Sequence, residues 1–170
     1  MRVAVLYHSE TGNTRRMAEL VAQGVTLEDP GGVFDMRLVD VVEAGEEELE
    51  FLADSRVVFV GCPTYYGTIS WQMKRFLDTL RSRGVNLAGK IGASFSSANW
   101  PGGGGYELTC LALVQVLLIK GVLVYTGGIK AGRVPTHFGA VSRKKPKGFD
   151  ADRCVQLGSN VAKKALELWG

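Results

Sequence analysis

The stretch that decides the fold lies at the start of the chain, where Val3-Ala4-Val5-Leu6-Tyr7 is followed by Ser9-Glu10-Thr11-Gly12-Asn13-Thr14. The first five residues are an apolar run typical of a strand. Beyond the polar stretch, apolar residues recur at helical spacing, at Met17, Leu20, Val21 and Val25. Three hydroxyl side chains and a glycine therefore occupy a strand-to-helix turn, which directs backbone N–H groups and the positive end of a helix dipole at one point. We predict a phosphate-binding loop here. The alternative is an ordinary capped turn, because Ser, Thr and Asn all favour helix starts.

Size and composition place the chain among ordinary globular proteins. Its 170 residues are 46% hydrophobic and 22% charged, which predicts one domain, 1–170, with a core of its own. No segment is long enough for a membrane span, and the first residues form a strand instead of a signal peptide. The three cysteines, Cys62, Cys110 and Cys154, are far apart and form no Cys-x-x-Cys pair. We therefore expect no disulfide framework, no metal site and a reducing, cytoplasmic setting.

Strand-like and helix-like patterns alternate along the whole chain. Strands are predicted at Arg2–Tyr7, Val33–Val39, Arg56–Gly61, Ile91–Phe95 and Val122–Thr126, and helices at Arg15–Val25, Glu46–Leu52, Trp71–Leu80, Leu108–Lys120 and Asp152–Leu168. Four of the strands are nearly continuous apolar runs, typical of strands buried on both faces of a parallel sheet, whereas Arg37 marks the second as an edge strand. The pattern predicts an α/β fold with a doubly wound five-stranded parallel sheet, helices on both faces and the common strand order 2-1-3-4-5. Thr126–Gly148 is predicted to be the longest irregular stretch.

This strand order predicts where a ligand binds. The sheet reverses direction between its first and third strands, so a ligand should lie outside the carboxyl ends of those strands. The loop after the third strand carries the adjacent tyrosines Tyr65 and Tyr66, and the loop after the fourth carries Trp100 followed by a run of glycines. A phosphate cradle beside these aromatic side chains predicts a ligand with a phosphate and a planar ring system.

Two stretches resemble known families. Residues 9–14 resemble the flavodoxin phosphate loop, Ser/Thr-x-Thr-Gly-x-Thr. Residues 61–78, which read Gly-Cys-Pro-Thr-Tyr-Tyr-Gly-Thr-Ile-Ser-Trp-Gln-Met-Lys-Arg-Phe-Leu-Asp, are similar to WrbA-type NAD(P)H:quinone oxidoreductases and related FMN reductases. Residues 89–97, the Gly102–Gly105 run and Glu107 resemble the same branch. The chain departs from that branch at Thr11, where those enzymes often carry an aromatic, and at Ile119-Lys120, where they have a pair of histidines.

The resemblance implies a flavodoxin-like fold with FMN as the cofactor. Residues 9–14 would hold its phosphate, residues 64–66 would edge the isoalloxazine ring, and residues 96–100 would lie on the opposite side. The full set expected around FMN is Ser9, Glu10, Thr11, Gly12, Asn13, Thr14, Pro63, Thr64, Tyr65, Tyr66, Gly67, Ser96, Ser97, Ala98, Asn99 and Trp100. A substrate pocket is expected at Tyr66, Trp100, His137 and Phe138.

The resemblance favours an NAD(P)H-dependent quinone or flavin oxidoreductase in which the flavin, and no side chain, carries the chemistry. NAD(P)H would donate a hydride, and a quinone or another small acceptor would then use the same pocket. The alternative is a flavodoxin-type carrier of single electrons between partner proteins. Such carriers are acidic as a family, whereas this chain has a net charge of +3 and a sequence pI near 8.8. A homo-oligomer is left open.

Three further features have a functional and a structural interpretation. His8 is expected to pack at the end of the first strand, and Cys62 to be an inert small apolar residue. The run Arg143-Lys144-Lys145-Pro146-Lys147 could bind a nucleotide 2′-phosphate or RNA, but a short basic run is usually only solvated. Nucleic-acid binding is rejected because the run has neither interleaved aromatic residues nor a broader basic face.

Overall fold

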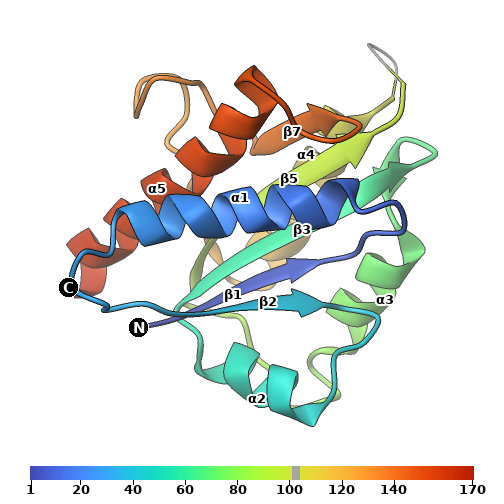
Figure 1. Cartoon of the computed structure of the whole chain (residues 1–170). Helices are drawn as coiled ribbons and strands as arrows, with labels where there is room; N and C mark the ends of the chain where they lie inside the picture. The colour runs from blue at the N-terminus through green and yellow to red at the C-terminus, as the bar shows by residue number, and fades with distance from the viewer. Residues whose placement is uncertain (101–103) are drawn as a thin grey trace.

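Helices and strands alternate from the first residues to the last in the computed structural model, which describes residues 1–100 and 104–170 (Figure 1). In chain order the elements are β1 (Arg2–Tyr7), α1 (Asn13–Leu27), β2 (Asp35–Asp40), α2 (Glu46–Asp54), β3 (Val57–Tyr65), β4 (Thr68–Ile69), α3 (Trp71–Thr79), β5 (Ile91–Ala98), α4 (Tyr106–Ile119), β6 (Leu123–Val124), β7 (Ala140–Arg143) and α5 (Phe149–Trp169). The five predicted helices are confirmed, and each begins or ends within three residues of its predicted bounds.

The sheet has the predicted parallel order. Its strands run β2-β1-β3-β5-β6, which is 2-1-3-4-5 in the numbering of the five predicted strands. Val3–Tyr7 of β1 pairs with Val57–Gly61 of β3, and β3 pairs in turn with β5. The edge position predicted for the second strand is confirmed, since β2 pairs only with β1 among the described strands. The loops that follow β1 and β3 therefore start side by side at the carboxyl ends of the strands and run toward opposite faces of the sheet.

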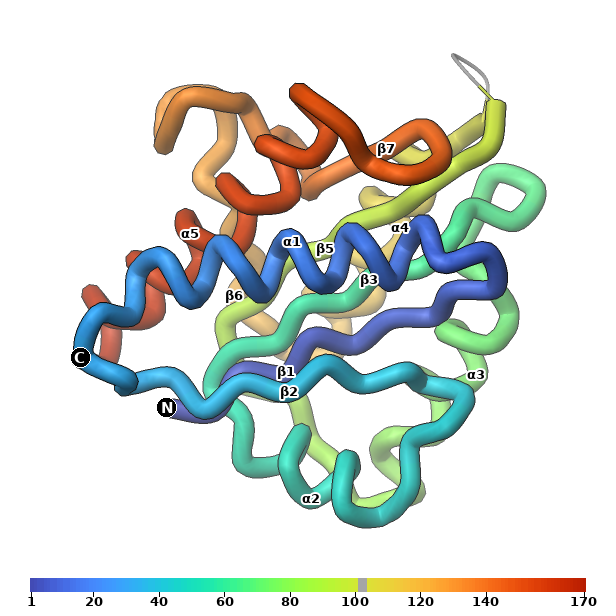
Figure 2. Tube along the Cα trace, in the orientation of Figure 1, coloured from blue at the N-terminus to red at the C-terminus, as the bar shows by residue number. Residues whose placement is uncertain are grey.

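The fifth strand differs from the prediction. Only Leu123–Val124 of the predicted Val122–Thr126 pairs, and it pairs with the first two residues of β5. Residues 125–139 then leave the sheet, and β7 returns to pair with the last four residues of β5 (Figure 2). The stretch Thr126–Gly148 is therefore not wholly irregular. The strand within this stretch, β7, has four residues, too few to show a hydrophobic periodicity in the sequence, and it is recognised by its pairing with β5.

The third strand continues four residues beyond its predicted end and turns back as a hairpin. Thr64 and Tyr65 pair in antiparallel fashion with Ile69 and Thr68 of β4. The two residues between them, Tyr66 and Gly67, have φ values of 49° and 82°. Positive φ at both central positions is the requirement of a type I′ turn, which glycine meets without strain and a tyrosine does not. The hairpin therefore holds Tyr66 outward at the end of the sheet.

Both faces of the sheet are buried, as the continuous apolar runs predict. Alternate residues of β1 enter different cores: Val3 and Val5 pack with α1 and α5, whereas Ala4 and Leu6 pack with α2, α3 and α4. Helices α1 and α5 approach closely because glycines lie at their crossing. A Cβ on Gly24 would lie 2.0 Å from the Val155 carbonyl oxygen, and one on Gly158 would lie 2.0 Å from that of Val21.

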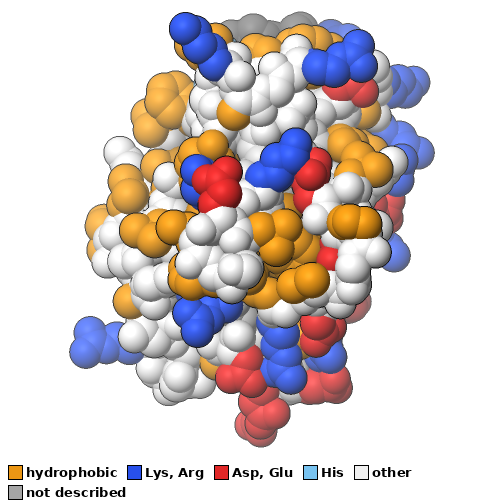
Figure 3. Space-filling model, turned by 90° about the vertical axis from the view of Figure 1, so that its left-hand side faces the viewer, with side chains coloured by type: hydrophobic (Ala, Val, Ile, Leu, Met, Phe, Trp, Pro, Cys, Tyr) orange, Lys and Arg blue, Asp and Glu red, His pale blue; other side chains and the backbone are white. Residues whose placement is uncertain are grey.

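The side of the molecule that carries the two termini has a mixed surface. In Figure 3, acidic and basic side chains are interspersed there among apolar patches. Of the helices in the described ranges, none combines the length and apolar character needed to cross a bilayer.

Candidate functional site

A cleft of about 860 Å³ opens at the carboxyl ends of β1, β3 and β5. The crevice forms because the chain leaves β1 for α1 on one face of the sheet and leaves β3 for α3 on the other. The residues that line it are Ser9, Glu10, Thr11, Asn13, Thr14, Pro63, Thr64, Tyr65, Tyr66, Gly67, Ser97, Ala98, Asn99, Trp100 and Gly104. Three loops that are distant in sequence thus meet where the strand order placed them. Pro101, Gly102 and Gly103 of the third loop lie outside the described residues.

The predicted phosphate loop has the features of an anion site. Gly12 precedes α1 in the left-handed conformation, with φ 79°, and a Cβ there would meet no atom within 4 Å. No side chain caps the 15-residue helix and no acidic residue lies in its first turn, so its N–H groups keep their positive field. The buried Ser9 hydroxyl has no hydrogen-bond partner within residues 1–100 and 104–170. A phosphate would supply the acceptors that these donors lack.

Two residues expected around the cofactor, Thr14 and Ser96, connect neighbouring loops through hydrogen bonds of their hydroxyl groups. Thr14 is buried, and its Oγ1 lies 2.8 Å from the Ser97 Oγ, which ties the first loop to the third. Ser96 does not line the cleft. Its hydroxyl instead donates to the Cys62 carbonyl at 2.8 Å and lies 3.1 Å from the Thr64 Oγ1. Ser96, expected from the resemblance to lie beside the flavin, thus has its side chain beneath the rim, because alternation along β5 turns it away from the lining residues.

Aromatic side chains form the walls of the cleft. Tyr66 is fully exposed at the tip of the β3–β4 hairpin, and Trp100 is 77% exposed on the β5 side. Tyr65 is half-buried, and its hydroxyl has no hydrogen-bond partner among the residues that the structure describes. Desolvation, with a contribution from the nearby Glu10, raises the pKa of Tyr65 to about 12, so the phenol stays neutral. These rings offer flat, uncharged surfaces to a planar ligand.

A polar cluster closes the base of the cleft. His8 is 5% exposed, and neither of its ring nitrogens has a hydrogen-bond partner in the described part of the chain. Its ring meets that of Tyr65 edge-on, with 6.2 Å between the centroids. Burial lowers the pKa of His8, which favours the neutral imidazole. The expectation that His8 packs at the end of β1 is confirmed. The sequence indicated no role for Gln72, but its side-chain amide donates to the Glu10 carboxylate at 3.4 Å. Its place in the Gln-Met-Lys motif of residues 72–74 is the signal that could have identified it.

The structure separates two of the expected substrate residues from the cleft. His137 and Phe138 do not line it. Their carbonyl oxygens accept hydrogen bonds from Thr126 at 2.6 Å and from Ser94 at 3.0 Å, respectively. They precede β7, whose first residue, Ala140, pairs with Phe95. Because β5 continues for three more residues toward the cleft, His137 and Phe138 lie below its carboxyl end. The structure therefore does not bring these two expected residues to the cleft with Tyr66 and Trp100. A sequence pattern could not show how far along β5 this segment returns.

Cys62 lies beneath the cleft as a buried thiol. It is fully inaccessible and is not among the lining residues. Desolvation raises the pKa of Cys62 to about 11, so the thiol stays protonated and unreactive at neutral pH. Its expected role as an inert apolar residue agrees with this burial.

Comparison with known proteins gives both of the relatives that the motifs suggest. The family described as Flavodoxin matches residues 5–106. A flavodoxin from Clostridium saccharobutylicum is 36% identical over 169 aligned residues, covering 99% of this chain and all of that protein. An NAD(P)H dehydrogenase (quinone) from Archaeoglobus fulgidus is 32% identical over 192 aligned residues, covering 98% of each. Among solved structures, a flavodoxin, WrbA-like protein from Agrobacterium tumefaciens has a TM-score of 0.75 and 25% identity, covering 98% of both chains.

The lengths of these alignments differ in an informative way. The clostridial alignment is no longer than this chain, whereas the archaeal one needs 192 positions for a chain of 170 residues. The archaeal dehydrogenase therefore carries segments that have no counterpart here.

Proposed function

This chain belongs to the flavodoxin family, whose cofactor is FMN, and we propose that it is an NAD(P)H-dependent quinone or flavin oxidoreductase that works by two-electron hydride transfer. When bound, FMN supplies the redox chemistry that no side chain of the cleft can provide. The protein's part is to bind, orient and shield the cofactor and its substrates.

The residues of the cleft fit this cofactor. The uncapped N-terminus of α1 and the unpartnered Ser9 hydroxyl suit its phosphate. Tyr65 and Tyr66 on the β3 side and Trp100 on the β5 side suit its planar ring. The hydrogen bond between Thr14 and Ser97 holds the two sides at a fixed separation. In this proposal these residues position the flavin, with Tyr66 and Trp100 bordering the space for a second ring.

The size of the cleft is the observation that carries the enzyme proposal. Ligand sites commonly measure about 300–1,000 Å³, and the cleft's 860 Å³ lies in the upper part of that range. In this proposal the cleft holds another planar group beside the flavin, first the nicotinamide and then the quinone. The exposed Tyr66 and Trp100 supply stacking surface for such a guest. A carrier that passes single electrons needs only an accessible ring edge.

Reduction by nicotinamides tests the proposal. The FMN-loaded protein, titrated anaerobically with NADPH and with NADH, should lose its flavin absorbance with at least one of them within seconds. Turnover with benzoquinone should then give parallel double-reciprocal lines, which indicate that the oxidised nicotinamide leaves before the quinone binds, as a shared pocket requires. Flavin absorbance that survives excess NADPH and NADH, yet is lost with dithionite, would overturn the proposal.

A flavodoxin-type electron carrier is the second candidate. It is favoured by the alignment with the clostridial flavodoxin, which covers both chains almost completely without added segments. In that case the cleft would receive FMN alone, and electrons would pass to partner proteins at its exposed rim. A protein inert to nicotinamides whose FMN is reduced by another redox protein would establish this function.

A further inference from the structure

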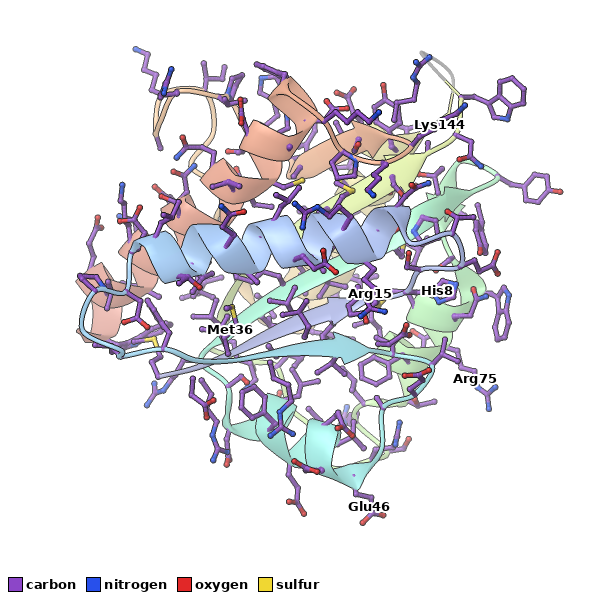
Figure 4. All side chains as sticks on the ribbon, viewed as in Figure 1. His8, Arg15, Met36, Glu46, Arg75 and Lys144 are labelled. Atoms are coloured by element: carbon purple, nitrogen blue, oxygen red, sulfur yellow. The ribbon has the colours of Figure 1, made fainter. Side chains whose placement is uncertain are left out.

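A cluster of cations lies against the rim of the cleft, in the turn between β7 and α5. We call residues 143–147, Arg143-Lys144-Lys145-Pro146-Lys147, the basic turn. Arg143 pairs with Ala98, which lines the cleft, and the Lys144 amide donates to the Ala98 carbonyl at 2.8 Å. Neighbouring strands lie about 4.8 Å apart, so the basic turn begins one strand away from the cleft. Figure 4 places Lys144 at the same end of the molecule as His8.

The basic turn is held in one conformation. Pro146 is buried, the Ser142 hydroxyl donates to the Lys144 carbonyl at 3.2 Å, and the Arg143 amide donates to Asp150 at 3.3 Å. Lys144 itself has a φ of 59°, a left-handed conformation that is costly for a lysine. Such strain concentrates at functional sites, where the surrounding structure imposes it. The cations therefore project from a fixed frame.

The positive charge of this turn is not neutralised within the described part of the chain. The side chains of Arg143, Lys144, Lys145 and Lys147 are all exposed, and none belongs to the ion pairs there. Asp150 and Asp152 follow in the first turn of α5, so four cations face two carboxylates. The α5 N-terminus, which has no side-chain cap, adds a further positive field.

We propose that the basic turn binds the 2′-phosphate of NADPH, so that the protein prefers NADPH to NADH; this inference rests on the proposed function. Among the described residues that line the cleft, Glu10 is the only charged one, so they offer a nucleotide's phosphates no cation. A nicotinamide ring stacked in the cleft must carry its adenosine end outside it. On the β5 side, the cations at the rim are those of the basic turn. Phosphate bound by several lysine and arginine donors forms the stronger, charge-assisted class of hydrogen bond.

Two adenosine nucleotides without nicotinamide test this assignment apart from catalysis. Calorimetry on the FMN-loaded protein should show adenosine 2′,5′-bisphosphate binding at least tenfold more tightly than 5′-AMP. Lys144→Gln combined with Lys145→Gln should abolish that difference and leave 5′-AMP binding unchanged. Two matched controls should preserve it: Lys130→Gln on the 125–139 loop, and Arg75→Gln on α3, which tests for a long-range effect of charge alone.

The outcomes separate this inference from the proposed function. Equal affinity for the two nucleotides, no measurable binding of the bisphosphate, or a difference that survives in the double variant would overturn the inference. So would an equal loss in Arg75→Gln. Equal rates of flavin reduction by NADPH and NADH would also overturn it while leaving the oxidoreductase intact. Failure of both nicotinamides to reduce the flavin would overturn the proposed function itself.

Discussion

Removing the Ser9 hydroxyl should change the stability of the FMN-free protein and its affinity for FMN in opposite directions. In the FMN-free protein the Ser9 Oγ is buried and has no hydrogen-bond partner among the described residues. A buried polar group without a partner costs about 1–3 kcal/mol of desolvation, so Ser9→Ala should leave the free energy of unfolding unchanged or raise it by about 1 kcal/mol. With FMN bound, the same change removes a hydrogen bond to a charged phosphate.

The expected loss of affinity follows from that hydrogen bond. Bonds to charged groups contribute about 1.5–3 kcal/mol, and every 1.4 kcal/mol is a tenfold change in the dissociation constant. Ser9→Ala should therefore weaken FMN binding by about 10- to 150-fold. Thr14→Val provides the contrast. Because Thr14 Oγ1 already pairs with Ser97 Oγ at 2.8 Å, its loss should destabilise the FMN-free protein by about 1 kcal/mol.

Urea unfolding of the FMN-free proteins and quenching of FMN fluorescence on binding measure the two quantities. Ser82→Ala, in the turn that follows α3, serves as a control that loses a serine hydroxyl away from the loop. The reasoning fails if Ser9→Ala destabilises the FMN-free protein by more than about 1 kcal/mol while FMN affinity stays within twofold. That result would make the Ser9 hydroxyl a structural group of the turn.

Three other changes test the fold, the base of the cleft and its rim. Gly158→Ala places a methyl group 2.0 Å from the Val21 carbonyl oxygen and should lower the free energy of unfolding by about 1–3 kcal/mol; an unchanged urea midpoint would contradict the close helix crossing. Because burial lowers the pKa of His8 from 6.5, its contribution to stability is fully present above pH 6.5 and is lost as the pH falls through the folded-state pKa. His8→Gln should therefore flatten the acid limb of the free energy of unfolding, measured by urea unfolding at a series of pH values. Trp100→Ala should reduce benzoquinone turnover, measured by steady-state kinetics, by a larger factor than it reduces FMN affinity. A larger loss of FMN affinity than of turnover would show that Trp100 contacts the flavin instead of the substrate.

The amino-acid pattern determines the framework of this protein because each part of it is encoded locally. The apolar run of β1 predicts a strand with the observed bounds, Arg2–Tyr7. Continuous apolar strands require helices on both faces, and right-handed crossovers then leave few strand orders. That order brings the loops after β1, β3 and β5 to one edge of the sheet. The position of the cleft was therefore predictable from the strand order. The residues expected around FMN came from the family resemblance, and they include every lining residue except Gly104.

Tertiary structure decided what depends on contacts between distant segments. The sequence by itself determined which loops meet, but not that Ser96 turns beneath the rim or that Tyr66 is held outward by a strained hairpin turn. Nor could it show that the fifth strand position is filled by two segments, since four residues of β7 carry no periodic signal without β5 beside them. That pairing withdraws His137 from the cleft and brings Lys144 against Ala98, 46 positions earlier in the chain. Periodicity encodes a residue's own element and face, whereas register between remote strands is set only when the whole sheet packs.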